Sequence, residues 1–372
     1  MDYSQSVLLR DEHSERDTHT TQTHMLSVVQ ALVPSHSKLH DDAERDVYWE
    51  RVLEAWGVRL GKSSTTRFPG SNPCSIARHD LSKLKRHPYL VAHKSDGVRY
   101  LLFLTVRPGT TEDPVALMID RARNMYEVDV MAPDEYFLRG TLLEGELVWK
   151  QPEQHEMIYL VFDALLVAGD SYVRRPFSER LAAASRLTRW SEELAQMSPD
   201  DLEVRVQETD GIVLLHFDPR VTMKPKRFVD LKHVTRVWNE RGDAAHRIDG
   251  LILQRANASY VYGTSGDAIF KWKDQSSVDL AGKGTSLRAA DGPLGTTMHD
   301  RKIHIETSRV SASGEDDILE YHIEVTRDMV KLFPMRARPD KTVANGLRVV
   351  EATVRDVIEN IQPYELTGKG GG

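Results

Sequence analysis

The segment Lys94-Ser95-Asp96-Gly97-Val98-Arg99 decides the fold, and its pattern is K-x-D-G-x-R. A lysine amine can attack the α-phosphorus of a nucleoside triphosphate and keep the nucleoside monophosphate as a phosphoramidate. Gly97 lets the backbone turn tightly beside a phosphate, and Arg99 can offer a planar donor fork to ribose or phosphate. The apolar runs Tyr89–Val91 and Tyr100–Leu104 predict two strands joined by this motif.

A simpler interpretation of the same segment is a charged hairpin turn, because Asp-Gly is a common turn signal. Four fixed residue types match by chance in well under about 1% of chains of this length. Short motifs still produce false positives, so the rest of the sequence has to decide between the two interpretations.

The composition bounds the class of protein. A chain of 372 residues predicts two domains with an ample core, and no apolar stretch is long enough to span a bilayer. Its polar, acidic start lacks a signal-peptide pattern. The single cysteine, Cys74, excludes an internal disulfide and fits a reducing compartment. The net charge of −7 argues against a global basic field for coating nucleic acid but is compatible with a local basic cleft.

The pattern along the chain predicts an α+β protein with polar ends. Residues 1–44 are expected to form a disordered polar tail, and residues 368–372 a flexible glycine-rich end. The predicted helices cover residues 43–56, 177–194 and 346–361, and the predicted strands cover residues 142–149, 157–167 and 248–254. After Lys273, strand candidates at 302–307 and 318–325 alternate with glycine-rich loops, which is typical of a small β-barrel.

Five further clusters carry chemistry, and three of them also have a simpler structural interpretation. Glu144-Gly145-Glu146 could accept hydrogen bonds from ribose hydroxyls, or it could be an exposed turn. Phe162 in Phe162-Asp163 could stack on a base, or it could belong to a core strand. Asp249-Gly250-Leu251-Ile252 places a carboxylate before an apolar strand, where it could hold a divalent metal.

The last two clusters are basic. Lys271-Trp272-Lys273 puts two ammonium groups on one face of a strand, because side chains alternate with period two. Such a pair can grip an α-phosphate and lower the pKa of a nearby lysine, or it can be a solvated edge strand. Arg336-Ala337-Arg338-Pro339-Asp340-Lys341 offers a basic group for a leaving pyrophosphate.

In content and order, the segments K-x-D-G-x-R, E-G-E, F-D-A, D-G-L-I, K-W-K and R-x-R-x-D-K resemble the motif set of the mRNA capping enzyme guanylyltransferases. These enzymes belong to the covalent nucleotidyltransferase superfamily, which they share with DNA and RNA ligases. Phe68–Ser75, Tyr262-Gly263-Thr264 and Asn345 also match non-catalytic segments of the family. The similarity covers residues 68–361.

The resemblance implies a nucleotidyltransferase domain at residues 45–274, with ATP-grasp-like antiparallel sheets and helices. It implies an OB-fold β-barrel at residues 275–345 and, within residues 346–372, a C-terminal helix that packs back on the first domain. It also implies that Lys94 is the guanylylated nucleophile and that Asp249 supports Mg²⁺ or Mn²⁺. The implied ribose ligands are Arg99, Glu146 and Arg121, the implied guanine contacts are Phe162, Ile252 and Lys224, and the implied phosphate ligands are Lys271, Lys273, Arg336, Asp340 and Lys341.

Four positions depart from the family pattern without removing a reactive group. They are Leu332 for a usual tryptophan, Cys74 for a usual valine, Glu144 for a usual aspartate, and His93 directly before the nucleophile. Leu332 puts the local packing of the barrel in question.

The activity implied is a two-step transfer of GMP from GTP to a 5′-diphosphate RNA end, in the nucleus. The resemblance implies an RNA triphosphatase and the phosphorylated C-terminal tail of RNA polymerase II as partners, because the sequence leaves no room for a triphosphatase or methyltransferase domain. Two alternatives stay open: an ATP-dependent polynucleotide ligase, and an inactive RNA-binding or scaffold protein. Retention of every reactive residue disfavours the scaffold. Asp249, the F-P-G segment and the R-x-R-x-D-K ending disfavour the ligase.

Overall fold

The computed structural model describes residues 38–58, 68–151, 156–188, 211–214, 220–274, 276–283, 286–306, 317–338, 341 and 343–367. It divides into two compact units. The larger unit comprises Gln30–Trp272 and Gln362–Gly372, and the smaller unit comprises Lys273–Ile361 together with Met1–Val29. Most of the expected polar tail, residues 1–37, lies outside the described residues. None of the helices described is long and apolar enough to cross a membrane.

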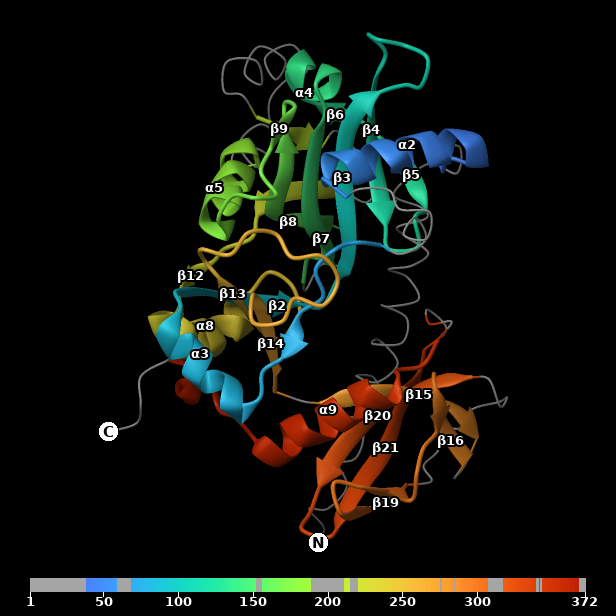
Figure 1. Cartoon of the computed structure of the whole chain (residues 1–372), viewed down its shortest axis with the longest axis vertical. Coiled ribbons are helices and arrows are strands. Elements are labelled where there is room, and N and C mark those ends of the chain that lie inside the picture. Colours follow the sequence, from blue (N-terminus) through green and yellow to red (C-terminus); the bar gives the residue numbers. More distant parts are fainter. Residues whose placement is uncertain are drawn as a thin grey trace, which may run out of the picture. The chain divides into compact units, whose positions relative to one another are not determined.

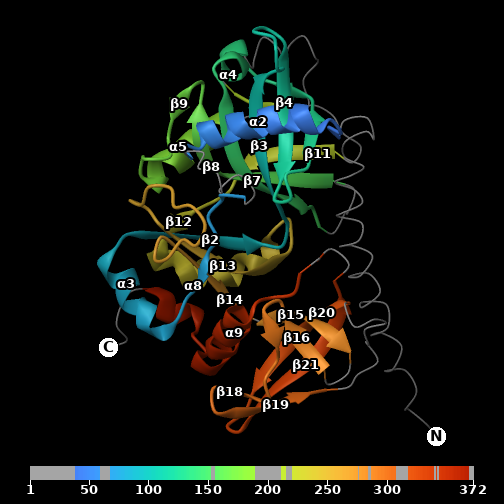
Figure 2. The same ribbon diagram turned by 45° about the vertical axis from the view of Figure 1, so that its right-hand side comes forward.

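The larger unit is built on two main sheets (Figures 1 and 2). Its strands are β1 (Cys74–Ser75), β2 (Tyr89–Ser95), β3 (Val98–Val106), β4 (Pro114–Asp120), β5 (Met125–Val128), β6 (Val130–Met131), β7 (Thr141–Trp149), β8 (Glu156–Val167), β9 (Asp170–Ser171), β10 (Val213–Leu214), β11 (Arg220–Pro225), β12 (Val229–Asp230), β13 (Ile248–Arg255) and β14 (Ile269–Lys273). Its helices are α2 (Asp42–Ala55), η1 (Arg78–Asp80), α3 (Leu81–Arg86), α4 (Asp134–Leu138), α5 (Phe177–Thr188), η2 (Leu231–His233), α8 (Val234–Asn239), η3 (Glu240–Asp243) and η4 (Pro363–Thr367).

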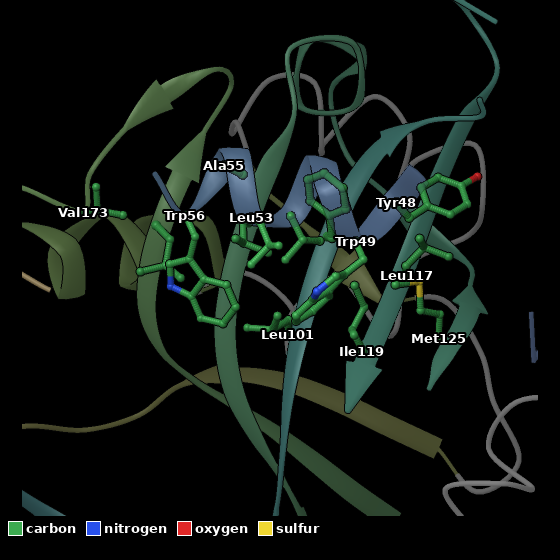
Figure 3. Packing of buried hydrophobic residues seen from close by; sticks show 14 of the residues in the cluster. Tyr48, Trp49, Leu53, Ala55, Trp56, Leu101, Leu117, Ile119, Met125 and Val173 are labelled. Atoms are coloured by element: carbon green, nitrogen blue, oxygen red, sulfur yellow. The ribbon is translucent and has the colours of Figure 1, made fainter. Parts of the chain in front are cut away.

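The first sheet has the order β11-β8-β7-β3-β4-β5, with β9 attached to β8. Helix α2 crosses one face of this sheet, and Asp41 caps its start by accepting a hydrogen bond from the Ala43 N–H at 2.9 Å. Figure 3 shows Trp49 and Leu53 of α2 over the strand residues Leu101 and Leu117. This apolar layer makes the first sheet a rigid support for one side of the site.

The second sheet has the order β1-β14-β13-β2-β12. Strand β2 pairs with β13 and β12, whereas β3 pairs with β4 and β7. The two strands predicted around the K-x-D-G-x-R motif are therefore confirmed, but they do not form a hairpin. The motif carries the chain from one sheet to the other. Lys94 therefore lies near the end of β2 in one sheet, and Arg99 lies near the start of β3 in the other.

Two glycines in the motifs are required by close packing. A Cβ at Gly97 would lie 2.5 Å from the Leu147 carbonyl oxygen, and one at Gly145 would lie 2.6 Å from the Tyr159 ring. Gly97 therefore lets the motif pack against β7, and its φ is not positive. Gly145 lies in the middle of β7, so E-G-E belongs to a strand and is not an exposed turn.

The smaller unit is a curled sheet with one helix (Figures 1 and 2). Its order is β17-β16-β15-β20-β21-β19-β18. Its elements are β15 (Ser277–Lys283), β16 (Ser286–Ala289), β17 (Gly292–Pro293), β18 (Thr297–Met298), β19 (Arg301–Ile305), β20 (Ile318–Val325), β21 (Met329–Ala337) and α9 (Leu347–Glu359). Leu332 is 1% exposed in its core, so leucine satisfies the packing at the position where the sequence raised a question.

The C-terminal helix contributes to the core of the smaller unit. Val350 and Val354 of α9 are buried there. Its amphipathic face is covered by the sheet that precedes it in sequence. Asn360 ends the helix in a left-handed conformation, with φ of 43°. The later residues Pro363 and Leu366 are the ones buried in the larger unit, where η4 contacts α8 and α3.

The other predicted elements agree closely with the structure. The predicted strand at 318–325 is β20, and the strands predicted at 142–149, 157–167 and 248–254 are β7, β8 and β13. The helix predicted at 177–194 is described as far as Thr188. The strand predicted at 302–307 ends earlier, at Ile305.

Candidate active site

Lys94 lies at the junction of the two sheets and faces Asp249. Its Nζ is 2.8 Å from Asp249 Oδ1 and 2.9 Å from Oδ2, and the two side chains are 23% and 26% exposed. Lys94 is opposite Gly250 in the pairing of β2 with β13, and a register shift between Ile248 and Gly250 releases Asp249 from the ladder. Bulges of this kind re-aim side chains near active sites. The D-G-L-I motif therefore presents its carboxylate to the lysine.

The charge of Lys94 is controlled by its neighbours. Burial lowers the pKa of Lys94, but Asp249, followed by Glu146 and Asp96, outweighs burial, and the pKa is raised above its usual value. The sequence argument expected Lys271, Lys273 and a bound metal together to lower this pKa, which stays a prediction. Among the protein groups, the carboxylate in direct contact with Lys94 dominates and favours its ammonium form.

Arg99 is locked in place by groups from distant parts of the chain. Its guanidinium donates to Glu144, to the Ser71 carbonyl oxygen at 2.5 Å, and to the hydroxyl of Tyr260 at 3.4 Å. Glu144 is 1% exposed and also accepts a hydrogen bond from Tyr260 at 2.9 Å. A Cβ at Gly70 would lie 2.6 Å from the guanidinium, which explains the glycine of the F-P-G segment. Glu144 therefore supports Arg99.

Phe162 is half-buried at a bulge in β8. Asp163 pairs with Glu144 and Val161 pairs with Gly145, so Phe162 has no partner on β7. The next residue anchors the bulge, because Asp163 and Arg180 form a fully buried bidentate pair at 2.8 and 3.0 Å. Phe162 is therefore presented from the sheet and is not a core residue. Its ring lies 5.8 Å from the centre of the Arg99 guanidinium.

Lys226 belongs to the site and was missed by the sequence analysis. Its Nζ lies 3.0 Å from Glu146 Oε2, 3.2 Å from Ser95 Oγ and 5.9 Å from the centre of the Phe162 ring. The Lys226 N–H donates to the Val161 carbonyl at 2.7 Å, directly beside the bulge. The sequence analysis predicted a guanine contact at Lys224, two residues before Lys226. Without the register of β11 against β8, the sequence could not tell which of the two lysines lies beside Phe162.

Three further predicted residues lie on the surrounding strands. Ile252 is opposite Ala92 on β2, two residues from Lys94, so the register places Ile252 on the same face of the second sheet as Lys94. Lys271 and Lys273 lie on β14, next to β13, and alternate with buried Trp272 as predicted.

Arg121 and Lys224 also lie near this group. Arg121 follows β4 and donates to Asn72 Oδ1 at 3.0 Å. Burial, followed by the charge of Arg99, lowers the pKa of Arg121, which indicates that the two guanidinium groups are neighbours. Lys224 lies on β11 opposite Leu160 and is close enough to lower the pKa of His246.

The last motif lies in the smaller unit. Arg336 Nε lies 2.7 Å from Glu320 Oε2, and Arg338 Nη1 lies 3.0 Å from Asp279 Oδ1. The Lys341 N–H donates to the Arg338 carbonyl at 3.0 Å, and the lysine side chain is exposed. Asp340 lies outside the described residues. Both arginines are thus paired with carboxylates that lie on the neighbouring strands β15 and β20 of the same sheet.

Two departures from the family pattern have structural roles. His93 is half-buried, and its Nε2 lies 2.6 Å from the Val237 carbonyl, which ties β2 to α8. Burial lowers the pKa of His93, so the neutral ring donates this hydrogen bond. Cys74 is half-buried in β1 opposite Phe270, where it replaces a residue of similar size without adding a reactive group to the site.

A strand-borne lysine beside a carboxylate, with an arginine and a presented aromatic ring on the adjoining sheet, is the arrangement expected of a covalent nucleotidyltransferase. The family model described as "mRNA capping enzyme, catalytic domain" matches residues 40–275, which is more than half of the chain. The chain therefore belongs to the mRNA capping enzyme family, whose catalytic domains are guanylyltransferases.

Relatives with curated names agree with this family. The mRNA-capping enzyme subunit alpha of Schizosaccharomyces pombe is 25% identical over 348 residues, covering 85% of this chain and 83% of that protein. The protein of the same name from Yarrowia lipolytica is 29% identical and covers 83% of each chain. The Saccharomyces cerevisiae protein of that name is 30% identical over 57% of this chain, and the match spans 46% of its own length.

One solved structure is similar at a low level. The structure titled "mycobacterial DNA ligase D complexed with ATP and MES" has a TM-score of 0.40 and 14% identity. It covers 73% of this chain and 95% of its own.

Proposed function

We propose that Lys94 is the nucleophile of an mRNA guanylyltransferase and that it forms a covalent Lys94–GMP from GTP. One observation carries the proposal: the Lys94 ammonium faces Asp249 at 2.8 and 2.9 Å, next to Arg99 and Phe162 on the adjoining sheet. A lysine becomes nucleophilic only when it loses its proton, so a carboxylate in contact is a natural resting partner. In-line attack on the α-phosphorus breaks the bond to pyrophosphate and forms the phosphoramidate.

The nucleoside part of GTP is proposed to lie between Phe162 and Ile252. Arg99, Arg121 and Glu146 are proposed to hold the ribose. Lys224 stays a prediction as the residue that distinguishes guanine. Lys226, beside Phe162 at 5.9 Å, is added as a second candidate for the guanine edge. Guanine offers the O6 and N7 acceptors to a lysine, whereas adenine has an amino group in place of O6.

The phosphates are proposed to bind to two sets of cations. Lys271 and Lys273 would contact the α-phosphate, which remains on the enzyme through both steps. Arg336, Asp340 and Lys341 would orient the β- and γ-phosphates, which leave with the first step. The smaller unit is proposed to be the OB-fold domain that carries this second set, with domain bounds at residues 275 and 345.

A divalent cation, Mg²⁺ or Mn²⁺, is proposed to bind at Asp249. Within the described residues, no group of three or more His, Cys, Asp or Glu side chains could hold a metal. Mg²⁺ nevertheless fits, because it keeps several waters and often binds through one carboxylate together with substrate phosphates. When bound, the cation would neutralise Asp249 and thereby lower the pKa of Lys94.

The acceptor is proposed to be a 5′-diphosphate RNA end, which attacks Lys94–GMP and yields a GpppN cap. The bond between Lys94 and the phosphorus then breaks, and Lys94 leaves as the amine. After Lys94 has taken up a proton, its ammonium can pair with Asp249 again. An RNA triphosphatase would have to supply the diphosphate end. The phosphorylated tail of RNA polymerase II and a nuclear location are proposed on the family relationship alone.

Incubation with α-labelled GTP or ATP, followed by denaturing electrophoresis, tests the proposal. A GMP band in the wild type that disappears in Lys94→Ala is expected. Lys85→Ala, on the exposed face of α3, is the matched lysine control and should keep the band. An AMP band would indicate a ligase, and no band would indicate a scaffold protein.

A further inference from the structure

Three side chains form a continuous polar chain behind the proposed nucleotide pocket. Lys226 Nζ lies 3.2 Å from Ser95 Oγ, and Ser95 Oγ lies 2.9 Å from His246 Nε2. Ser95 is 1% exposed and Lys226 is 7% exposed, and His246 is half-buried. Ser95 directly follows the proposed nucleophile, and His246 lies three residues before Asp249. None of the three has a role in the reaction described above, apart from the proximity of Lys226 to the base.

When Lys226 is charged, one arrangement of donors and acceptors pairs the three groups in sequence and uses the Ser95 proton within this polar chain. An ammonium only donates, so the Ser95 hydroxyl must accept from Lys226. The single Ser95 proton is then free to donate, and its neighbour on the other side is His246 Nε2. In this arrangement His246 presents a bare Nε2 and carries its proton on Nδ1, which is a neutral imidazole.

The surroundings of His246 favour that neutral form. Burial lowers the pKa of His246 to about 4, and the charges of Lys226, His93 and Lys224 act in the same direction while Glu146 opposes them. At neutral pH the ring is thus uncharged and can accept the Ser95 proton. Both lysines that are candidates for the guanine edge lie close enough to affect this one ring.

Lys226 also has a competing partner. Glu146 Oε2 lies 3.0 Å from its ammonium and is 19% exposed, whereas the Ser95 side is buried. Glu146 alone would hold the ammonium by an ion pair that permits many directions, because a lysine ammonium is a point charge on a flexible stem. The oriented Ser95 hydroxyl adds a second, directional contact, which fixes where the ammonium stands beside Phe162.

We propose that His246 is a positioning residue for base selection: through Ser95 it holds the Lys226 ammonium at the edge of the purine pocket. This inference rests on the proposed function, because it assumes that the base lies on Phe162. Loss of the His246 acceptor frees the Ser95 hydroxyl to rotate, and Lys226 then loses its fixed direction. Discrimination between a guanine O6 acceptor and an adenine amino donor should fall, while general nucleotide binding should change less.

The test compares His246→Leu, His246→Gln and Ser95→Ala. Binding of GTP and of ATP is measured by equilibrium titration, and Lys94–GMP and Lys94–AMP formation is measured across nucleotide concentrations. His246→Leu and Ser95→Ala should reduce the GTP-over-ATP preference roughly tenfold, as loss of one hydrogen bond to a charged group implies. The Gln side-chain oxygen can still accept the Ser95 proton, so His246→Gln should keep the preference to within about threefold. His79→Gln, whose side chain is 71% exposed, is the histidine control.

Two results would overturn the inference. One is an unchanged GTP-over-ATP ratio in His246→Leu and Ser95→Ala. The other is an equal loss of both nucleotides in His246→Leu and His246→Gln, which would mark a purely structural role. Failure of the proposed function gives a different outcome, because the wild type would then form no Lys94–GMP at all. Base selectivity in the binding titration would still be measurable in that case.

Discussion

The two units treat their basic side chains differently. In the larger unit, Lys94 is paired with Asp249 on the adjacent strand β13 of the second sheet, and Lys226 is paired with Glu146 on β7 of the first sheet. In the smaller unit, Arg336 and Arg338 are paired with carboxylates on the neighbouring strands β15 and β20, with Glu320 shared between them. The first arrangement holds together a site that joins two sheets. The second prepares a basic group within a single sheet.

This difference indicates which ion pairs have to change during the reaction. In the proposed reaction, Lys94 attacks only after its ammonium has lost a proton and left Asp249, so the pair in the larger unit would be a resting state. The pairs in the smaller unit orient the guanidinium groups of Arg336 and Arg338. Asp279 also bonds through its backbone to Asn345, so the strand that opens the smaller unit and the segment after the last motif form one body.

The largest expected effect is at Lys94. Lys94→Ala and Lys94→Arg should both abolish the GMP adduct, because arginine stays protonated and cannot attack. The measurement is label retained on the denatured protein after incubation with GTP. Adduct of normal intensity in either variant would show that another residue is the nucleophile. The Lys94–Asp249 pair would then have no need to break during the reaction, and it would not differ in this way from the pairs of the smaller unit.

The next effect separates the units by step. Arg336→Ala should slow adduct formation by roughly 10²–10³-fold, as loss of one charge-stabilising donor implies. Transfer from preformed Lys94–GMP to diphosphate-ended RNA should change little, since the β- and γ-phosphates have left. Single-turnover rates of the two steps provide the measurement.

Lys271→Ala provides the comparison in the larger unit. It should slow both steps, because its proposed α-phosphate contact is made in both transition states. If Arg336→Ala slowed transfer as much as adduct formation, the smaller unit would have to remain engaged in the second step.

A smaller effect concerns the base. Phe162→Ala should weaken GTP binding by ~1–3 kcal/mol through lost stacking. The bulge that presents Phe162 is anchored by Asp163 and Arg180, so the fold itself should survive the truncation. Titration of GTP, with the unfolding midpoint as a control, provides the check. Lys224→Ala in the same assay should narrow the GTP-over-ATP preference if Lys224 reads the base, and an unchanged ratio would leave Lys226 as the candidate.

The smallest effect is a pH dependence in the larger unit. The pKa of His246 is lowered to about 4 from its usual 6.5, so the unfolded chain takes up the proton first as the pH falls. The contribution of neutral His246 to stability is therefore complete above pH 6.5 and is lost as the pH falls towards 4. It should amount to about 1–2 kcal/mol after allowance for partial exposure. Denaturant unfolding of wild type and His246→Gln should diverge in this range, and parallel pH profiles would contradict the assignment.

The sequence by itself determined most of the elements and the candidate reactive groups. Lys94, Asp249, Lys271 and Lys273 could be predicted as candidates because the proposed chemistry requires these residue types in this order, and the order is written in the chain. Strands such as β20 and the helix α2 follow from local hydrophobic periodicity, which short segments carry without tertiary help.

Only the tertiary structure decided how these groups meet. Three features depend on strand pairing and register, which are set by long-range contacts. They are the placement of β2 and β3 in different sheets, the bulge at Phe162 and the bulge beside Asp249. For the same reason the sequence passed over Lys226, whose neighbours Ser95, Glu146 and Phe162 are far from it along the chain. Likewise, the effect of Asp249 on the pKa of Lys94 could not be predicted until the fold had brought the two side chains into contact.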